Sequence, residues 1–233
     1  MLRHKGIEHE IVDIPPGTQQ VFLRVRGFGA GTVPALEIDG RKVQGSLEIS
    51  RALEELVPES PLFPADPERR AAVEAAERWG EAALQPVPRN LFRWGAAHDQ
   101  ELRLALARMT GWPAPDVAAR LTKPVGWYFS RVVSGSTEDS IRADLANLPL
   151  LLDHVDGLID AGVIGGEEPN AADFQIATSV KILLGLPQIR GLVESRPAAE
   201  LAQRITPGFG REVPLKLPAD WVPEPAQTAL ATS

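Results

Sequence analysis

Apolar positions divide this chain into a front region of short, broken runs and a long remainder with helical spacing. Polar and apolar residues alternate over residues 8–14 until two prolines stop the run, and this alternation predicts a β-strand. A short helical turn is expected after Thr18, where apolar residues recur at helical spacing. The front region therefore begins as a strand followed by a helix.

A hairpin is predicted next, over residues 34–44. Two short apolar runs flank Asp39-Gly40, a pair that favours a type I′ turn because both central positions need positive φ. The helix that follows has Gly45 as its expected N-cap and Glu48 in its first turn, near the positive end of the helix dipole. The order is then strand, helix, hairpin and helix within sixty residues.

The remainder of the chain is predicted to be helical. Prolines interrupt residues 60–67, and Asp66-Pro67 is a typical helix start. The expected helices cover residues 68–84, 99–109, 137–161, 170–184 and 197–205. Pro149 lies inside one of them and predicts a kink or break. Residues 207–233 carry five prolines and predict an extended strap that frays after Glu224.

A variant of the capping box is predicted where residues 170–184 begin. Asn170 is the expected N-cap, and Asp173 follows it three residues later. Side chains in these two positions satisfy backbone N–H groups at a helix start. We therefore assign Asp173 to helix nucleation and not to catalysis.

Composition and charge exclude several classes of protein. The 233 residues are 44% apolar and 24% charged, which is typical of a globular protein. The net charge of −7 lacks the basic footprint expected for binding nucleic acid or an anionic membrane. No apolar stretch is long enough to span a membrane, and the charged first ten residues do not resemble a signal peptide. The expected location is the cytoplasm.

Metal and thiol chemistry find no support in the sequence. The chain has no cysteine, so it has no disulfide, no thiolate metal ligand and no cysteine nucleophile. Its four histidines are far apart and never at i, i+4 spacing. We therefore expect no metal site.

Two short segments are candidates for binding. Val33-Pro34 enters the first strand of the predicted hairpin, where a proline must lie at a strand start or edge. On residue type alone its peptide bond is expected to be trans. Gln44-Gly45-Ser46 opens a helix, whose free N–H groups favour a carboxylate or phosphate. The alternative for this second segment is a plain helix cap that binds nothing.

Taken together, these segments resemble the glutathione S-transferase family. The matching motifs are Val33-Pro34-Ala35-Leu36, Asp39-Gly40, Gln44-Gly45-Ser46, Glu48-Ile49, the Pro61-Leu62-Phe63-Pro64 linker and the cap at Asn170 to Asp173. The resemblance covers residues 1 to about 206. It implies an α+β fold, with a thioredoxin-like N-terminal domain (1–60, lacking its first strand) followed by an all-α C-terminal helical bundle (67–206) and a Pro-rich tail (207–233).

The resemblance also implies a binding site for glutathione. The backbone of Val33, next to a cis Pro34, would pair with the cysteinyl part of the ligand, and Ser46 would hold its γ-glutamyl carboxylate. Gly45 stands where family members usually have an acidic residue that receives the ligand's amino group. Gln44 is the substitute candidate for that contact, through its side-chain carbonyl.

A pocket for the second substrate is implied near the end of the first helix of the second domain. Arg89, Phe92 and Trp94 are its candidate walls, with core packing as the alternative. Tyr128, the one tyrosine, is expected to be pocket wall or core and not the catalyst.

The thiol-activating residue of the family has no counterpart in this sequence. Residues 1–10 resemble the tail of the family's first helix followed by its second strand, so the first strand and the catalytic Tyr, Ser or Cys are missing. Either the true start lies upstream, which we favour, or the chain is a degenerate relative in which the strand 8–14 pairs differently.

The function that the resemblance implies is transfer of a glutathione-type thiol to a small electrophilic substrate. Glutathione would be the co-substrate, no metal would take part, and the protein would be a homodimer. The alternative is a catalytically inactive interaction module with the same fold.

Overall fold

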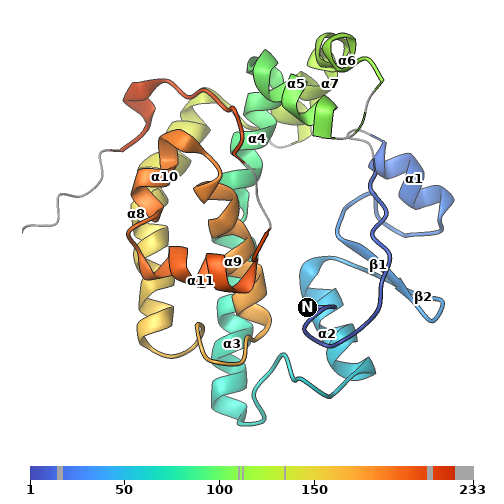
Figure 1. Cartoon of the computed structure of the whole chain (residues 1–233), viewed down its shortest axis with the longest axis vertical. Coiled ribbons are helices and arrows are strands. Elements are labelled where there is room, and N and C mark those ends of the chain that lie inside the picture. The colour runs from blue at the N-terminus through green and yellow to red at the C-terminus, as the bar shows by residue number, and fades with distance from the viewer. Residues whose placement is uncertain (15–17, 110, 112, 134, 209–211, 224–233) are drawn as a thin grey trace, which may run out of the picture.

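The computed structural model describes residues 1–14, 18–109, 111, 113–133, 135–208 and 212–223 (Figure 1). An N-terminal part carries the sheet, and a larger helical part stands beside it. The N-terminal part consists of α1 (Gln19–Val25), β1 (Ala35–Ile38), β2 (Arg41–Gln44) and α2 (Ser46–Leu56). This is a thioredoxin-like arrangement with a sheet of two strands among the described residues.

The predicted hairpin is confirmed. Strands β1 and β2 are antiparallel, with Leu36 opposite Val43. Asp39 and Gly40 have φ values of 49° and 78°, as a type I′ turn requires. Helix α2 then packs against β2, and its buried Leu53 joins Val43 in the core.

The predicted strand over residues 8–14 is wrong. These residues contain no strand, and no hydrogen bond joins their backbone to another described residue. A strand exists only where a neighbouring strand supplies its hydrogen-bond partners, and β1 pairs with β2 alone. Residues 8–14 have the alternating pattern of a strand, but no neighbouring strand among the described residues pairs with them.

The first residues form a turn that is closed in the manner of a helix end, in agreement with the helix tail that the family resemblance implies. Gly6 has a φ of 66°, and its N–H donates to the carbonyl of Arg3 at 3.1 Å. The N–H of Ile7 donates to the carbonyl of Leu2 at 2.9 Å. This pair of bonds around a left-handed glycine is the Schellman motif.

Lys5 ties this turn to the end of α2. Its buried ammonium donates to Glu54 Oε2 at 2.9 Å and to the carbonyl of Val57 at 2.6 Å. The same Glu54 oxygen accepts the N–H of Leu62 at 2.9 Å. One ion pair thus fixes both the start of the chain and the linker that leaves the N-terminal part.

The helical part accounts for the rest of the described chain. Its elements are α3 (Pro67–Trp79), η1 (Gly80–Leu84), α4 (Pro86–His98), α5 (Gln100–Met109), α6 (Pro115–Leu121), α7 (Lys123–Tyr128), η2 (Phe129–Val133), α8 (Glu138–Asp160), α9 (Ala171–Leu184), α10 (Pro187–Val193), α11 (Pro197–Ile205) and η3 (Ala219–Trp221). Helix α9 is the most buried of them and packs against α3, α10 and α11. The expected all-helical remainder is confirmed.

Two details of the helical part differ from prediction. The segment 68–84 is not one α-helix, because its last turn, η1, is π-helical and leads directly into α4. Of the kink or break predicted at Pro149, the break is absent, and α8 runs through this proline without interruption. Buried neighbours such as Leu148 and Leu152 hold that turn against the core, so packing offsets the lost hydrogen bond.

The expected strap lies across the helical part. In residues 212–223, the side chains of Leu215, Leu217 and Trp221 are buried. Trp221 packs against Trp94 with ring centroids 5.2 Å apart. The frayed end expected after Glu224 lies outside the described residues.

A buried carboxylate joins the two parts. Glu77 of α3 accepts a 2.6 Å hydrogen bond from the hydroxyl of Ser50, on α2, and pairs with Arg51. Burial raises the pKa of Glu77, although the bonds from Ser50 and Arg51 oppose that rise. The orientation of α2 therefore depends on a side chain from the helical part.

Candidate functional site

The structure brings the two candidate segments together. The N–H of Gly45 donates to the carbonyl of Pro34 at 3.0 Å, extending the β1–β2 ladder by one pair. The Val33–Pro34 peptide bond is cis, as the family resemblance implies and the residue types alone do not. Val33-Pro34 therefore lies directly beside the start of α2.

The start of α2 has no cap from its own side chains. Gly45 is the N-cap, with φ 91° and ψ 144°, and it has no side chain to accept the free N–H groups. The N–H groups of Ser46, Leu47 and Glu48 donate to no other described residue. The half-buried Ser46 hydroxyl has no hydrogen bond to a described residue either. Three amides, one hydroxyl and the positive end of the helix dipole are thus open to an anion.

The backbone of Val33 forms the other side of the site. Its side chain is 56% exposed, and its N–H and carbonyl have no partner among the described residues. A residue with both groups free is able to pair with the backbone of a peptide ligand. The site therefore offers a short peptide edge on one side and an anion site on the other.

Gln44 holds the loop that leads into this edge. Its side-chain carbonyl accepts the N–H of Ala30 at 2.8 Å, and its amide donates to the carbonyls of Ala30 and Thr32 at 2.8 and 3.2 Å. The side-chain carbonyl of Gln44, which was expected to receive a ligand's amino group, therefore accepts a hydrogen bond from Ala30 instead. Gln44 positions the site and leaves ligand contact to its neighbours.

Comparison with known proteins relates the N-terminal part of the chain to a known domain. Residues 1–61 match the sequence profile described as the glutathione S-transferase N-terminal domain. The N-terminal part of the chain is therefore similar in sequence to that domain. A solved glutathione S-transferase from Rhodospirillum rubrum F11 shares the fold, with a TM-score of 0.52 and 21% identity over 94% of this chain and 89% of that one.

Two curated relatives are maleylacetoacetate isomerases, from Mus musculus and Rattus norvegicus. Each is 38% identical to this chain over 87 residues. The match spans 36% of this chain and 40% of each relative's length. It therefore relates the chain to a portion of those enzymes.

Of the four residues expected to line a second-substrate pocket, one lines a cavity that is formed by described residues. Trp94 is buried and lines a cavity of about 350 Å³ whose walls include His98 and Trp127. Arg89, Phe92 and Tyr128 are not among its walls. The indole Nε1 of Trp94 is buried and has no hydrogen-bond partner among the described residues. Trp127 also lines this cavity and was not predicted from the sequence, although it is an aromatic residue directly before Tyr128, which was predicted.

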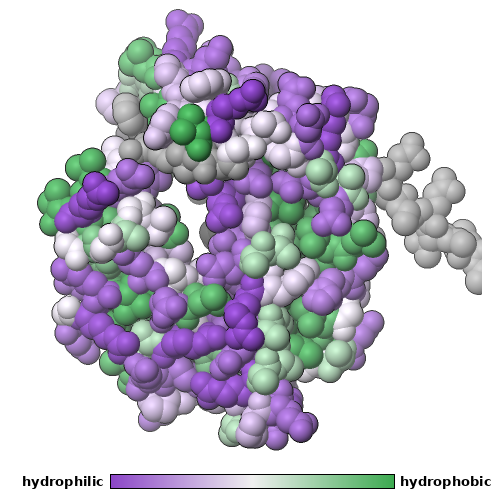
Figure 2. Space-filling model, turned by 180° about the vertical axis from the view of Figure 1, so that it is seen from behind, coloured by the Kyte–Doolittle hydropathy of each residue, from purple (hydrophilic) through white to green (hydrophobic). Residues whose placement is uncertain are grey.

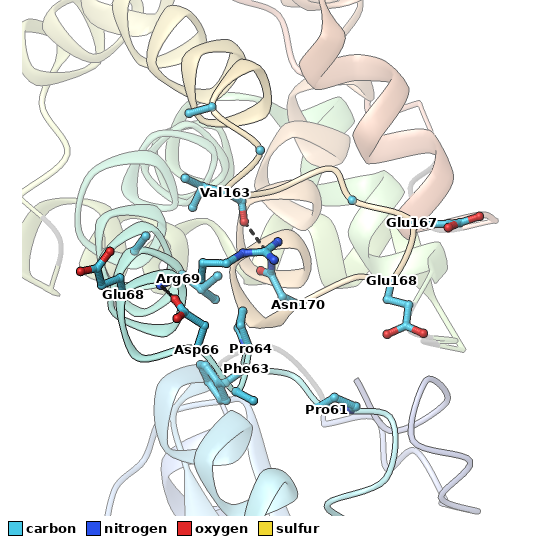
Figure 3. A pocket seen from close by; sticks show the side chains of 16 residues that line it. Pro61, Phe63, Pro64, Asp66, Glu68, Arg69, Val163, Glu167, Glu168 and Asn170 are labelled. Carbon is cyan, nitrogen blue, oxygen red and sulfur yellow. Dashed lines mark hydrogen bonds between the residues drawn. The ribbon is translucent and has the colours of Figure 1, made fainter.

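A second cavity, of about 740 Å³, lies between the linker and the loop that precedes α9 (Figure 3). The cap side chains Asp66 and Asn170 line it, and both are already bonded within the protein. Glu167 and Glu168 point away from these caps. The cavity holds none of the predicted site residues.

Within the described residues, no group of three or more His, Cys, Asp or Glu side chains is placed to hold a metal ion. In the same part of the chain, no helix combines the length and apolar character needed to cross a membrane.

Proposed function

We propose that this protein binds a glutathione-type thiol peptide beside Pro34 and transfers it to a small electrophile. The observation that carries the proposal is the bond from Gly45 to Pro34, which sets a free peptide edge next to an open helix start. Val33 would pair with the cysteinyl backbone, and Ser46 would donate to the γ-glutamyl carboxylate. A hydrogen bond whose acceptor is an ionised carboxylate is stronger than a bond between two neutral groups. The contact from Ser46 would therefore contribute most to the affinity for the thiol peptide.

The reaction would break the S–H bond, with the proton passing to solvent or a base, and form a bond from the thiol sulfur to an electrophilic carbon. Either a leaving group would depart from that carbon with its bonding electrons, or a π bond at that carbon would open and its electron pair would take up a proton. The thiolate is the nucleophile, so a donor that lowers the thiol pKa would accelerate the step. We assign no residue of this chain to that role. The described residues supply binding and orientation.

Each part of the chain would have its own role in binding the two substrates. Residues 1–60 would hold the thiol peptide, residues 67–206 would supply the walls for the electrophile, and residues 207–233 would brace those walls. Trp94 is the predicted pocket residue that lines a cavity, and Arg89, Phe92 and Tyr128 are kept as weaker candidates. A homodimer in the cytoplasm is the expected working form.

Isomerisation is a second candidate, favoured by the 38% identity to the two maleylacetoacetate isomerases. Such a reaction would leave the thiol peptide unconsumed, whereas transfer would consume it. Measuring free thiol during turnover separates the two activities. Binding without any turnover would instead indicate the inactive interaction module.

Retention on immobilised glutathione tests the site. We expect the wild-type chain to be retained and released by free glutathione, and Ser46→Ala to be retained at least tenfold less. Ser195→Ala, an exposed serine in the helical part, is the matched control and should behave like the wild type. Equal retention of the wild type and Ser46→Ala would remove Ser46 from the account, and no retention of either would overturn glutathione binding.

A further inference from the structure

The cavity of about 350 Å³ lies at the end of the helical part that carries α5, α6 and α7. Its described walls are the end of α4, the segment from α7 to η2 and the start of α8. None of these walls comes from the N-terminal part, whereas the site proposed for the thiol peptide lies within residues 33–47. Cavities that bind small molecules measure roughly 300–1,000 Å³, so this one is of a size for a small ligand of its own.

Two buried side chains in these walls have no hydrogen-bond partner among the described residues. Trp94 is 6% exposed, and its indole Nε1 donates to none of them. Ser136 is 2% exposed, and its hydroxyl oxygen is in the same position. Buried indole N–H and hydroxyl groups normally have a partner, because leaving one unpaired costs its full desolvation. Both groups therefore lack a partner at the place where a ligand would lie.

The start of α8 adds two more donors to the same walls. The Thr137 hydroxyl caps this helix by accepting the N–H of Ser140 at 3.2 Å. The N–H groups of Glu138 and Asp139, which come before Ser140, donate to no described residue, and both residues line the cavity. Donors thus predominate in the walls, and the matching ligand is one that brings an acceptor.

Aromatic contacts fix the orientation of the Trp94 indole. Its ring stacks on that of His98, with centroids 4.7 Å apart and planes 20° from parallel. His98 Nδ1 lies 2.8 Å from the carbonyl oxygen of Trp94, and it donates because a carbonyl only accepts. Trp221 also packs against the indole. The indole N–H is therefore held in one direction before any ligand arrives.

Trp127 is the exposed aromatic wall, at 55%. An exposed side chain changes rotamer within nanoseconds, so this ring is able to move aside for a ligand and then stack on it. Val125 and Val132 are exposed on the same segment, and Figure 2 shows apolar surface at that end of the molecule. These walls favour a flat ligand that is largely apolar.

The charges around the cavity decide which kind of acceptor fits. Glu138 and Asp139 carry exposed carboxylates, and Arg131 is the one fully charged cation among the described walls. Two negative charges therefore face one positive charge at neutral pH. A carboxylate or phosphate would be repelled, whereas a carbonyl oxygen accepts the same hydrogen bonds without bringing a charge.

We propose that this cavity binds a small, neutral aromatic compound whose carbonyl oxygen accepts the hydrogen bond from Trp94 Nε1. The ring of the compound would lie against Trp127, and a primary amide would also donate to the Ser136 hydroxyl. Water would satisfy either polar group but would leave the aromatic walls uncovered. The inference concerns binding within the helical part, so it does not depend on the thiol peptide.

Benzamide is the probe, and the ¹H–¹⁵N signal of the Trp94 indole is the readout. The chain has five tryptophans, and the indole signal that Trp94→Phe lacks identifies Trp94. We expect this signal to move downfield and to saturate as benzamide is added to the full chain. Benzoate has the same shape with a negative charge, and it should bind at least tenfold more weakly.

Matched variants locate the ligand. Trp94→Phe keeps an aromatic ring without the donor and should bind benzamide at least fivefold more weakly, as measured by calorimetry. Trp79→Phe makes the same change on α3, outside the described walls, and should alter the affinity less than twofold. Ser136→Ala should weaken binding severalfold. Thermal unfolding of each variant checks that it is folded.

Three outcomes would overturn the proposal. Absence of a saturable shift of the Trp94 indole with benzamide would indicate that water alone meets the two buried groups. Equal affinity of the wild type and a folded Trp94→Phe would show that the indole is not the donor. Benzoate binding as tightly as benzamide would contradict the argument from charge. Retention on immobilised glutathione is a separate result, so this inference and the proposed function fail independently.

Discussion

The first N–H groups of α2 and of α9 differ in whether side chains of the protein accept hydrogen bonds from them. At α9, the side-chain oxygen Oδ1 of Asn170 accepts the N–H groups of Ala172 and Asp173 at 3.0 and 3.2 Å. Asp173 accepts the N–H of Asn170 at 2.8 Å and that of Gly165 at 2.7 Å. At α2, Gly45 supplies no side chain, and the first N–H groups stay free.

The difference separates a structural helix start from one suited to a ligand. The cap at α9 is internally complete, and Asp173 is fully buried, so no ligand could improve it. The start of α2 lies beside the exposed Val33 and keeps its hydroxyl and amides available. A helix dipole alone does not indicate a binding site, and what decides is whether the protein has already satisfied its own donors.

Removing the α9 cap should have the largest effect. Asp173→Ala leaves the buried N–H groups of Gly165 and Asn170 without an acceptor, each costing roughly 1–3 kcal/mol. We expect the free energy of unfolding to fall by about 3 kcal/mol in urea denaturation. Glu138→Ala, in the first turn of α8, is the exposed control and should cost less than about 1 kcal/mol. Equal losses would contradict the structural role of Asp173.

Glu77 tests how firmly the helical part holds α2. Glu77→Ala removes the carboxylate that accepts from Ser50 and leaves Arg51 without its counter-ion, while the Ser50 hydroxyl keeps the Leu47 carbonyl as an acceptor. Because Arg51 is partly exposed and water will solvate it, we expect a loss of about 2 kcal/mol, below that of a fully buried pair. Denaturation of Glu77→Ala and of Glu74→Ala, a surface ion-pair variant of the same helix, measures the contrast.

The pH dependence of the same residue sharpens that test. Burial raises the pKa of Glu77 above its ordinary value of 4.5, so the native state holds the proton more tightly than the unfolded state. Its contribution to stability is therefore greatest below pH 4.5 and is lost as pH rises through the raised pKa. Relative to the wild type, Glu77→Gln should gain stability as pH rises through this window. A constant difference across that range would contradict the raised pKa.

Ser46→Ala should weaken binding without weakening the fold. Losing one hydroxyl bond to a carboxylate costs roughly 1.5–3 kcal/mol, which corresponds to at least a tenfold rise in Kd. The hydroxyl has no bond to a described residue, so the free energy of unfolding should change by less than about 0.5 kcal/mol. Calorimetry with glutathione and urea denaturation test both halves. A stability loss that matches the binding loss would indicate a structural serine.

Gln44→Ala should give the smallest effect. It removes three bonds that hold the loop at Ala30 and Thr32, all of them near the surface. We expect a stability loss of about 1 kcal/mol and a severalfold rise in the Kd for glutathione, because Val33 would be less well positioned. Gln20→Ala, on the neighbouring helix, is the control. Unchanged binding would show that the loop needs no support from Gln44.

Local features were predictable from the sequence, because their partners are close by in the chain. The turn at Asp39-Gly40 and the cap at Asn170 and Asp173 depend on residues within four positions. The strand over 8–14 was not, because a strand depends on a distant neighbour, and here no described residue provides one.

Contacts between residues that are far apart in the sequence account for the other differences between prediction and structure. The side chain of Gln44 is hydrogen-bonded to Ala30, fourteen residues away, and no local sequence pattern predicts this contact. Glu77 meets Ser50 across the joint between the two parts of the molecule. The candidate residues Val33, Gly45 and Ser46 were found because the family resemblance linked two segments that the sequence alone leaves separate.

The most direct test is a titration of the ¹⁵N-labelled chain with glutathione, followed by amide chemical shifts. We predict saturable shifts at Val33, Ser46 and Leu47, and none at the amides of Ala172 and Asp173, whose donors are already occupied. Absence of shifts at Ser46 and Leu47 at saturating ligand, or shifts of equal size at both helix starts, would contradict the account.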